Sequence, residues 1–231
     1  MKTKRKGIIL AGGTGTRLWP LSIFTSKHLL PIYDKPLIYY PLTTLMLAEI
    51  DDILIVTTDQ FKHNFVSLLG DGKQWGVNIN YKIQKSPKGI VDALIISEDF
   101  IGDNQIALIL GDNIFYGSGL SKQLNNLSKS DAKASVFAYN VLNPNEYGVC
   151  KFNNNNEICD IIEKPKNYIS NWVIPGIYFY NSGFLDYAKK TYVSMRNELE
   201  ITSLNNLFLK ENSLYVHKLD RGFAWLDAGS P

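Results

Sequence analysis

The sequence predicts an α/β fold with a largely parallel central sheet, and three observations lead to this prediction. Apolar runs of strand length alternate with helix-length segments through the first 140 residues, which is typical of strand–helix–strand units. The first run, residues 8–11, leads directly into three closely spaced glycines. Polar and charged residues follow several later runs. Ligands collect at the carboxyl ends of such strands, so we expect the functional site there.

The first half of the chain is expected to supply most of the parallel sheet. Strands are predicted at residues 7–11, 52–58, 77–83, 105–110 and 134–139. Helices are predicted between them, at residues 37–49, 60–69, 90–100 and 119–129. Pro41 counts against the first helix, because proline removes a helix hydrogen bond.

The second half changes to shorter extended segments. They are predicted at residues 148–152, 157–163, 174–180, 214–219 and 223–226, with helices at 182–190 and 202–210. The four asparagines at 153–156 indicate a turn. No repeat or linker separates the halves. Residues 1–231 are therefore expected to form a single domain, with the half from about residue 141 fused onto the same sheet.

Composition restricts the class of partner. The 231 residues include 24 basic and 22 acidic side chains, giving a net charge of +2. This small net charge does not indicate binding to nucleic acid or to a membrane surface. The basic N-terminal residues precede only a short apolar run, so neither a signal peptide nor a membrane helix is expected. Cys150 and Cys159 are too few for a disulfide framework. We expect a cytoplasmic protein that binds small molecules.

The loop after the first strand has the layout of a phosphate cradle. Gly12, Gly13 and Gly15 allow backbone N–H groups to converge on phosphate oxygens. The loop lacks the third glycine of a dinucleotide fingerprint, and the chain has no Walker motif. On the glycines alone, a plain strand-to-loop turn stays open. Arg17 and, ten residues later, Lys27 add two cations, and together these features suit a triphosphate.

Two aspartates form the candidate metal site. Asp112 follows the apolar run 107–110, and Asp227 follows the run 223–226. Carboxylates that end two strands far apart in the sequence can bracket one Mg²⁺, which prefers carboxylate and phosphate oxygens. For Asp112 alone the alternative is a turn cap shared with Asn113.

No covalent nucleophile stands out in the sequence. His28, His63 and His217 belong to no serine or cysteine pattern, and surface or packing roles are expected for them. The features above instead indicate direct displacement at phosphorus, in which positioning and electrostatics carry the rate.

Several blocks of sequence, in order, resemble one known family. The blocks are Leu10–Leu18, Ser26–Lys27, Leu29–Pro31, Asp34–Pro36, Tyr39–Leu42, Leu69–Gly72, Gln84, Ser86–Pro87, Gly89, Leu110–Gly117, Glu146–Val149, Glu163–Pro165, Gly176–Tyr180, Glu198–Thr202 and Arg221–Gly229. From Lys6 to its last residue the chain resembles the sugar-1-phosphate nucleotidylyltransferases, and among them the thymidylyltransferases. The resemblance implies a Rossmann-like sheet of the nucleotide-diphospho-sugar transferase type, with a nucleotide-binding half at about 1–140 and a sugar-binding half at about 141–231.

The resemblance also implies roles for individual residues. Arg17 and Lys27 would stabilise charge on the reacting phosphates, and Asp112 and Asp227 would hold Mg²⁺. The nucleotide would be bound by Leu10, Gly12, Gly13, Thr14, Gly15, Thr16, Gln84, Pro87, Gly89 and Asp112. The sugar phosphate would be bound by Asn113, Tyr147, Gly148, Glu163, Lys164, Gly176 and Trp225. Without the resemblance, Gln84 is a polar residue at a strand end, and Glu163 and Lys164 are a solvated pair.

The reaction implied is attack by a sugar 1-phosphate oxygen on the α-phosphorus of a nucleoside triphosphate. The leading substrates are dTTP and glucose 1-phosphate, giving dTDP-glucose for surface polysaccharide. The same reaction with CTP, UTP or another sugar 1-phosphate stays open. A catalytically silent nucleotide-sugar-binding module is disfavoured, because Arg17, Lys27, Asp112 and Asp227 are all present.

Three departures from the family pattern qualify the expected specificity. His28 and Asp92 stand where the family usually has glutamine. Beside a triphosphate we expect His28 to favour its cation, since nearby negative charge raises the pKa of a histidine. The sequence also ends at Ser230 and Pro231, where relatives continue into C-terminal helices that build subunit contacts and a regulatory site. A homo-oligomer and regulation by nucleotide are therefore open.

Overall fold

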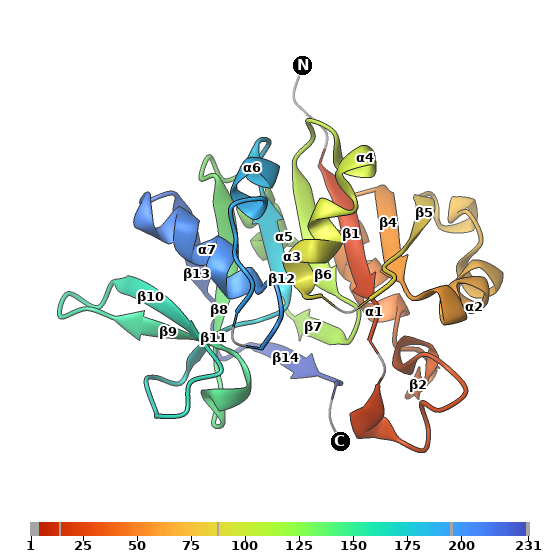
Figure 1. Cartoon of the computed structure of the whole chain (residues 1–231), viewed down its shortest axis with the longest axis horizontal. Helices are drawn as coiled ribbons and strands as arrows, with labels where there is room; N and C mark the ends of the chain where they lie inside the picture. Colours follow the sequence, from red (N-terminus) through yellow and green to blue (C-terminus); the bar gives the residue numbers. More distant parts are fainter. Residues whose placement is uncertain (1–4, 14, 87, 195, 230–231) are drawn as a thin grey trace.

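The architecture is a large twisted sheet with helices on both faces (Figure 1). The computed structural model describes residues 5–13, 15–86, 88–194 and 196–229. Ten strands form the central sheet, in the order β10-β9-β11-β8-β12-β6-β1-β4-β5, with β13 paired to β8. Both halves of the chain contribute to this one sheet.

The first half of the chain forms the parallel part of the sheet. Its strands are β1 (Lys6–Ala11), β4 (Asp52–Thr57), β5 (Asn78–Ile83) and β6 (Ile106–Leu110), and β1 lies between β4 and β6 in parallel register. Side chains alternate between the two faces. Ile8 and Leu54 therefore belong to one buried cluster and Ile9 and Ile55 to the other.

The second half extends the sheet mainly by antiparallel pairing. Its strands are β9 (Gly148–Phe152), β10 (Ile158–Glu163), β11 (Trp172–Ile174), β12 (Ile177–Tyr180) and β13 (Leu214–Lys218), and they pair around β8 (Ala134–Asn140), the last strand of the first half. β12 joins the halves, since it pairs antiparallel with both β6 and β8. The largely parallel sheet expected from sequence is thus parallel among β1, β4, β5 and β6, and beyond β6 only the pair of β13 with β8 is parallel.

Helices cover both faces. On one face lie α1 (Tyr39–Leu47), α2 (Asp59–Leu69) and α5 (Leu120–Ser128), and on the other lie α3 (Ile90–Ile95), α4 (Glu98–Ile101), α6 (Phe184–Ala188) and α7 (Ile201–Lys210). A separate two-stranded ribbon, β7 (Asn113–Gly117) with β14 (Phe223–Asp227), lies below the sheet in Figure 1. The remaining pieces are β2 (Pro31–Ile32), β3 (Lys35–Pro36) and single turns at Thr16–Leu18, Lys27–Leu29, Lys73–Trp75 and Pro144–Glu146.

Two sequence predictions need correction. The helix predicted at 90–100 is two helices, because the buried Ser97 hydroxyl donates to the carbonyl of Ala93 and ends the first. The strand predicted at 174–180 is interrupted at Pro175 and Gly176, since proline has no N–H for the ladder. β7 was not predicted. Pro41, in contrast, fits in the first turn of α1, where its missing N–H has no helical partner to lose.

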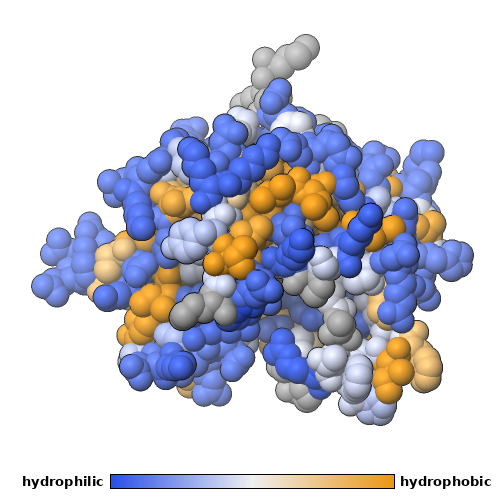
Figure 2. Space-filling view, in the orientation of Figure 1, coloured by the Kyte–Doolittle hydropathy of each residue, from blue (hydrophilic) through white to orange (hydrophobic). Residues whose placement is uncertain are grey.

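The molecular face in Figure 2 is mostly hydrophilic, with apolar side chains in separate groups. Within the described residues, no helix combines the length and the apolar character needed to cross a bilayer.

Candidate active site

Two cavities open at the carboxyl ends of β1 and β6, and they meet at Asp112. The glycine-loop cavity is lined by Leu10, Gly12, Gly13, His28, Gln84, Gly89, Ile90, Leu110, Asp112 and Glu198. The Trp225 cavity includes Arg17, Asp112, Asn113, Tyr147, Gly148, Glu163, Lys164, Gly176, Arg196, Trp225 and Asp227 in its wall. Most residues predicted for the nucleotide thus line one cavity, and all those predicted for the sugar phosphate line the other.

A cation and a carboxylate form the centre of the site. The Lys27 ammonium donates to Oδ2 of Asp112, and the side chains are only 12% and 15% exposed. Burial acts to raise the pKa of Asp112, but the charge of Lys27 and hydrogen bonds from Lys27 and Asn113 outweigh it. The pKa of Asp112 therefore lies below its ordinary value, and the group is a carboxylate at neutral pH.

Asp227 reaches the same point from the end of β14. The backbone N–H of Ala228 donates to the carbonyl of Asp112 at 2.9 Å, and that of Gly229 donates to Oδ1 of Asp227 at 2.9 Å. A Cβ on Gly229 would lie 2.9 Å from Oδ1 of Asp227 and 3.0 Å from Oδ2 of Asp112. The two carboxylates therefore converge over a position where only glycine leaves room.

The pair of carboxylates fits a divalent cation that shares its ligands with substrate. Burial raises the pKa of Asp227, and the nearby charge of Asp112 raises it further, so a cation between them would relieve both costs. Over the described part of the chain, no group of three or more His, Cys, Asp or Glu side chains could hold a metal. Two carboxylates suit Mg²⁺, which usually keeps several water or phosphate oxygens as ligands.

The glycine loop turns sharply beside this pair. Gly13 has a φ of 109°, which side chains rarely adopt. Gly15 lies against Ser22, whose hydroxyl donates to the carbonyl of Gly15 at 2.6 Å. Arg17 follows on an exposed turn and borders the Trp225 cavity. Gly15 and Thr16 are not part of either cavity wall, and Thr14 and Pro87, also predicted to bind nucleotide, lie outside the described residues.

Asn113 holds the wall of the Trp225 cavity together. Its Oδ1 accepts from the backbone of Gly176 at 2.9 Å and from the indole N–H of Trp225 at 2.6 Å, and its Nδ2 donates to Oδ1 of Asp112 at 2.9 Å. The residue is 2% exposed. Asn113 was predicted to contact the sugar phosphate, but its amide is engaged in fixing three neighbouring groups of the site.

Two aromatic rings form the apolar side of this cavity. The rings of Tyr147 and Trp225 meet edge to face with centroids 5.0 Å apart, and Tyr139 contacts Trp225 from another side at 5.9 Å. Such contacts fix the rings in place. Burial raises the pKa of Tyr147, so its hydroxyl stays protonated at neutral pH.

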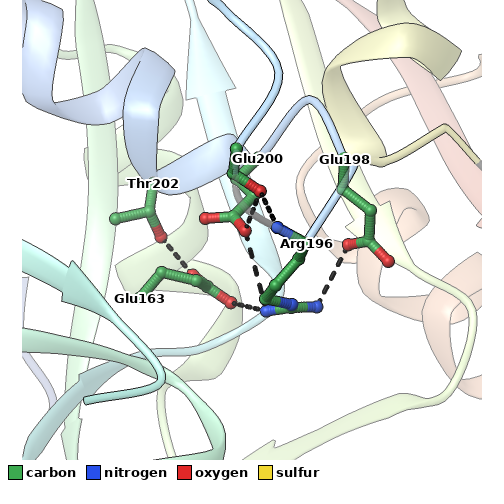
Figure 3. A network of polar contacts seen from close by, with 6 residues as sticks. Glu163, Arg196, Glu198, Glu200 and Thr202 are labelled. Atoms are coloured by element: carbon green, nitrogen blue, oxygen red, sulfur yellow. Dashed lines mark hydrogen bonds and ion pairs between the residues drawn. The ribbon is translucent and has the colours of Figure 1, made fainter.

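Sequence reasoning missed an ionic network in the wall of the same cavity (Figure 3). The guanidinium of Arg196 lies 3.2 Å from Glu163, 3.1 Å from Glu198 and 3.8 Å from Glu200, and Thr202 donates to Glu163. Glu198–Thr202 was one of the family-like blocks, which was the available signal for the glutamates. Arg196 lies in an irregular segment and carried no signal.

Comparison with known proteins identifies the family of this chain. Residues 6–231 match the profile of the family described as "Nucleotidyl transferase". The chain belongs to the nucleotidyl transferase family. A glucose-1-phosphate thymidylyltransferase from Xanthomonas campestris pv. campestris (strain B100) is 51% identical over 228 residues, covering 99% of this chain and 77% of the relative. The same enzyme from Neisseria meningitidis serogroup A is 50% identical, covering 97% and 78%.

Solved structures agree with these relatives. A Bacillus anthracis protein assigned to the same enzyme class, in complex with sucrose, superposes with a TM-score of 0.89 at 39% identity over 98% of this chain and 90% of that one. A UDP-glucose pyrophosphorylase complexed with UDP-glucose gives 0.84 at 26% identity, covering 98% and 94%. The resemblance inferred from the sequence blocks and the predicted fold type are both confirmed.

The burial of one side chain in this nucleotidyl transferase argues against the charge expected for it beside a triphosphate. His28 was expected to favour its cation, but it is 1% exposed, and its Nδ1 lies 2.9 Å from the hydroxyl of the buried Ser26. Burial, and then the charge of Lys27, lower the pKa of His28 to about 3. The imidazole is therefore neutral at physiological pH, and it meets the glycine-loop cavity as an uncharged ring.

Proposed function

We propose that this nucleotidyl transferase is a glucose-1-phosphate thymidylyltransferase that converts dTTP and glucose 1-phosphate to dTDP-glucose and pyrophosphate. One observation carries the proposal. Asp112 lies where the two cavities meet, and both Lys27 and Asp227 lie beside it. A triphosphate in the glycine-loop cavity and a sugar phosphate in the Trp225 cavity would bring their phosphates together there. The substrates named are those of the relatives at about 50% identity.

The proposed step is a direct displacement. An oxygen of the sugar phosphate attacks the α-phosphorus, a new P–O bond forms, and the bond to the bridging oxygen of pyrophosphate breaks. Lys27 and Arg17 stabilise negative charge on the phosphate oxygens, and positioning supplies the rest of the rate. A Mg²⁺ held by Asp112 and Asp227 would neutralise phosphate charge.

The Trp225 cavity offers matched groups for a hexose phosphate. Glu163 accepts hydrogen bonds from hydroxyl groups, as it already does from Thr202. Lys164 and Arg196 supply the cations for the phosphate. Tyr147 and Trp225 offer apolar surface to the sugar ring.

The remaining parts of the proposal concern the setting of the reaction. Nucleoside triphosphates are made and held in the cytoplasm, and we place the enzyme there, with surface polysaccharide as the use of its product. A homo-oligomer is also proposed, because the thymidylyltransferases that the sequence resembles form subunit contacts. The same chemistry with UTP is a second candidate, favoured by the UDP-glucose pyrophosphorylase that shares the fold.

A grid assay tests the function. Pyrophosphate release is measured for dTTP, UTP, CTP, ATP and GTP, each with several sugar 1-phosphates and Mg²⁺, and with sugar phosphate omitted as the blank. The highest kcat/KM is expected for dTTP with glucose 1-phosphate. If no pair releases pyrophosphate above the blank, the protein is a binding module and the proposal fails.

A further inference from the structure

The side-chain amide of Gln84 donates to two acceptors in this protein. Its Nε2 donates to Oδ2 of Asp92 at 2.8 Å and to the carbonyl of Gly89 at 3.3 Å. Both partners only accept hydrogen bonds when Asp92 is ionised. Asp92 is thus the side-chain acceptor that the Gln84 amide engages.

This arrangement leaves one orientation for the amide. If the amide turned over, Oε1 would face a carboxylate and a carbonyl with no proton between them, and the acceptors would lose their donor. Oε1 therefore points away from Asp92. It lies 3.6 Å from the position of a Cβ on Gly12, and Gly12 and Gln84 both line the glycine-loop cavity. Within the described residues, no donor to Oε1 is found.

The backbones on both sides of this contact are fixed. The N–H of Gln84 donates to the carbonyl of Thr57 at 2.8 Å, and the N–H of Val91 donates to the carbonyl of Leu199 at 3.1 Å. Asp92 stands in α3 between Val91 and Ala93, which are fully buried. The acceptor is thus held in place before any ligand arrives.

We propose that Asp92 is a specificity-positioning residue that locks Gln84 as a hydrogen-bond acceptor, so that the site selects pyrimidine bases with a proton on N3. This inference rests on the proposed function. Thymine and uracil carry an N3–H donor that Oε1 accepts. Cytosine has a lone pair at N3 and offers a donor only at its exocyclic amino group, so it must shift in the cavity. In this structure the choice against cytosine is made by Asp92 through Gln84.

The first test uses the wild-type protein. With glucose 1-phosphate held constant, kcat/KM is measured for dTTP, UTP, CTP and 3-methylthymidine triphosphate, in which a methyl group replaces the N3 proton. Both dTTP and UTP are expected to exceed CTP and the methylated analogue by about tenfold or more, the value of one good hydrogen bond. Equal use of CTP, or of the methylated analogue, overturns the inference.

The second test frees the amide. Asp92→Asn supplies a side chain that can donate or accept, so Gln84 can turn over, and the ratio of kcat/KM for dTTP to that for CTP is expected to fall by about tenfold. Asp186→Asn, the same change on exposed α6, is the matched control and is expected to keep the wild-type ratio. If Asp92 had a merely structural role, kcat/KM for dTTP and for CTP would fall together. An unchanged ratio of the two values in Asp92→Asn overturns the inference.

Misfolding of the variant and failure of the proposed function must both be distinguished from failure of this inference. If Asp92→Asn does not fold by circular dichroism, Asp92→Ala removes the same acceptor and replaces it in the comparison. Failure of the proposed function would show as no pyrophosphate release from any nucleotide. Failure of this inference would show as an active enzyme without the expected preference.

Discussion

Trp225 donates its indole N–H to Oδ1 of Asn113 at 2.6 Å, and this bond joins the two strands that deliver the carboxylates of the site. Asn113 follows Asp112 directly, and Trp225 precedes Asp227 by two residues. The same amide fixes the aromatic wall of the Trp225 cavity and one oxygen of Asp112. A single side chain thus sets the geometry of both the cavity wall and the carboxylate.

Removing Asn113 is expected to damage stability and rate together. Asn113→Ala leaves the indole N–H of Trp225 and the N–H of Gly176 buried without an acceptor, at about 1–3 kcal/mol for each group. Thermal unfolding and kcat with saturating substrates measure the two effects. Asn104→Ala, which removes one local bond to the carbonyl of Ile101, is the control, and equal Tm losses in the two variants would contradict the positioning role.

The two aspartates are expected to differ in stability but not in activity. Asp112→Asn and Asp227→Asn should each abolish turnover, because each loses a charge that would bind the metal. Asp227→Asn should keep or raise Tm, since it removes a buried charge that Asp112 repels. Pyrophosphate release over a Mg²⁺ titration and differential scanning fluorimetry separate these effects. Near-normal activity in either variant would show that the aspartate is not a metal ligand and only caps a turn.

Arg196 is expected to act on sugar-phosphate binding. Arg196→Ala should raise KM for glucose 1-phosphate by about tenfold or more through loss of charge-assisted hydrogen bonds, with little change in KM for dTTP. Its ion pairs are partly exposed, so Tm should change little. Lys189→Ala, which removes an exposed pair with Glu98, is the control. A similar KM in both variants would exclude Arg196 from the sugar site.

The buried His28 predicts a dependence of stability on pH. Its pKa falls from the ordinary 6.5 to about 3 in the folded protein, so the unfolded chain binds more protons between these values. The contribution of His28 is complete above about pH 6.5 and is lost as pH falls toward 3. His28→Gln should therefore flatten the fall of Tm in this window, whereas His63→Gln at an exposed site should not. Parallel curves for wild type and His28→Gln would contradict the buried neutral state.

Local patterns predicted the parallel core and the chemistry at its edge. β4 and β6 are nearly continuous runs of buried aliphatic residues bounded by polar ones, and such runs leave few alternatives. The glycine loop, Lys27, Asp112 and Asp227 were found because each stands at the end of such a run or in a family block. Each of these features is recognised from the few residues that flank it in the sequence.

The elements that escaped prediction depend on distant partners. β7 follows β6 after two residues and becomes a strand only through pairing with β14, more than a hundred residues later. Sequence reasoning left His28 open between a surface and a packing role, because its burial depends on packing against Phe65 and Gly111. Arg196 is placed by three glutamates, two of them in its own segment and one at the end of β10.

The β7–β14 ribbon has a consequence for inactivation by heat. It is a two-stranded sheet separate from the central one, and a pair of strands has little stability of its own. Local opening of the ribbon would carry Asp227 away from Asp112 while the ten central strands stay paired. Backbone amides of β14 are therefore expected to exchange with deuterium before those of β1 and β6, and catalysis should fail several degrees below the cooperative melting of the protein.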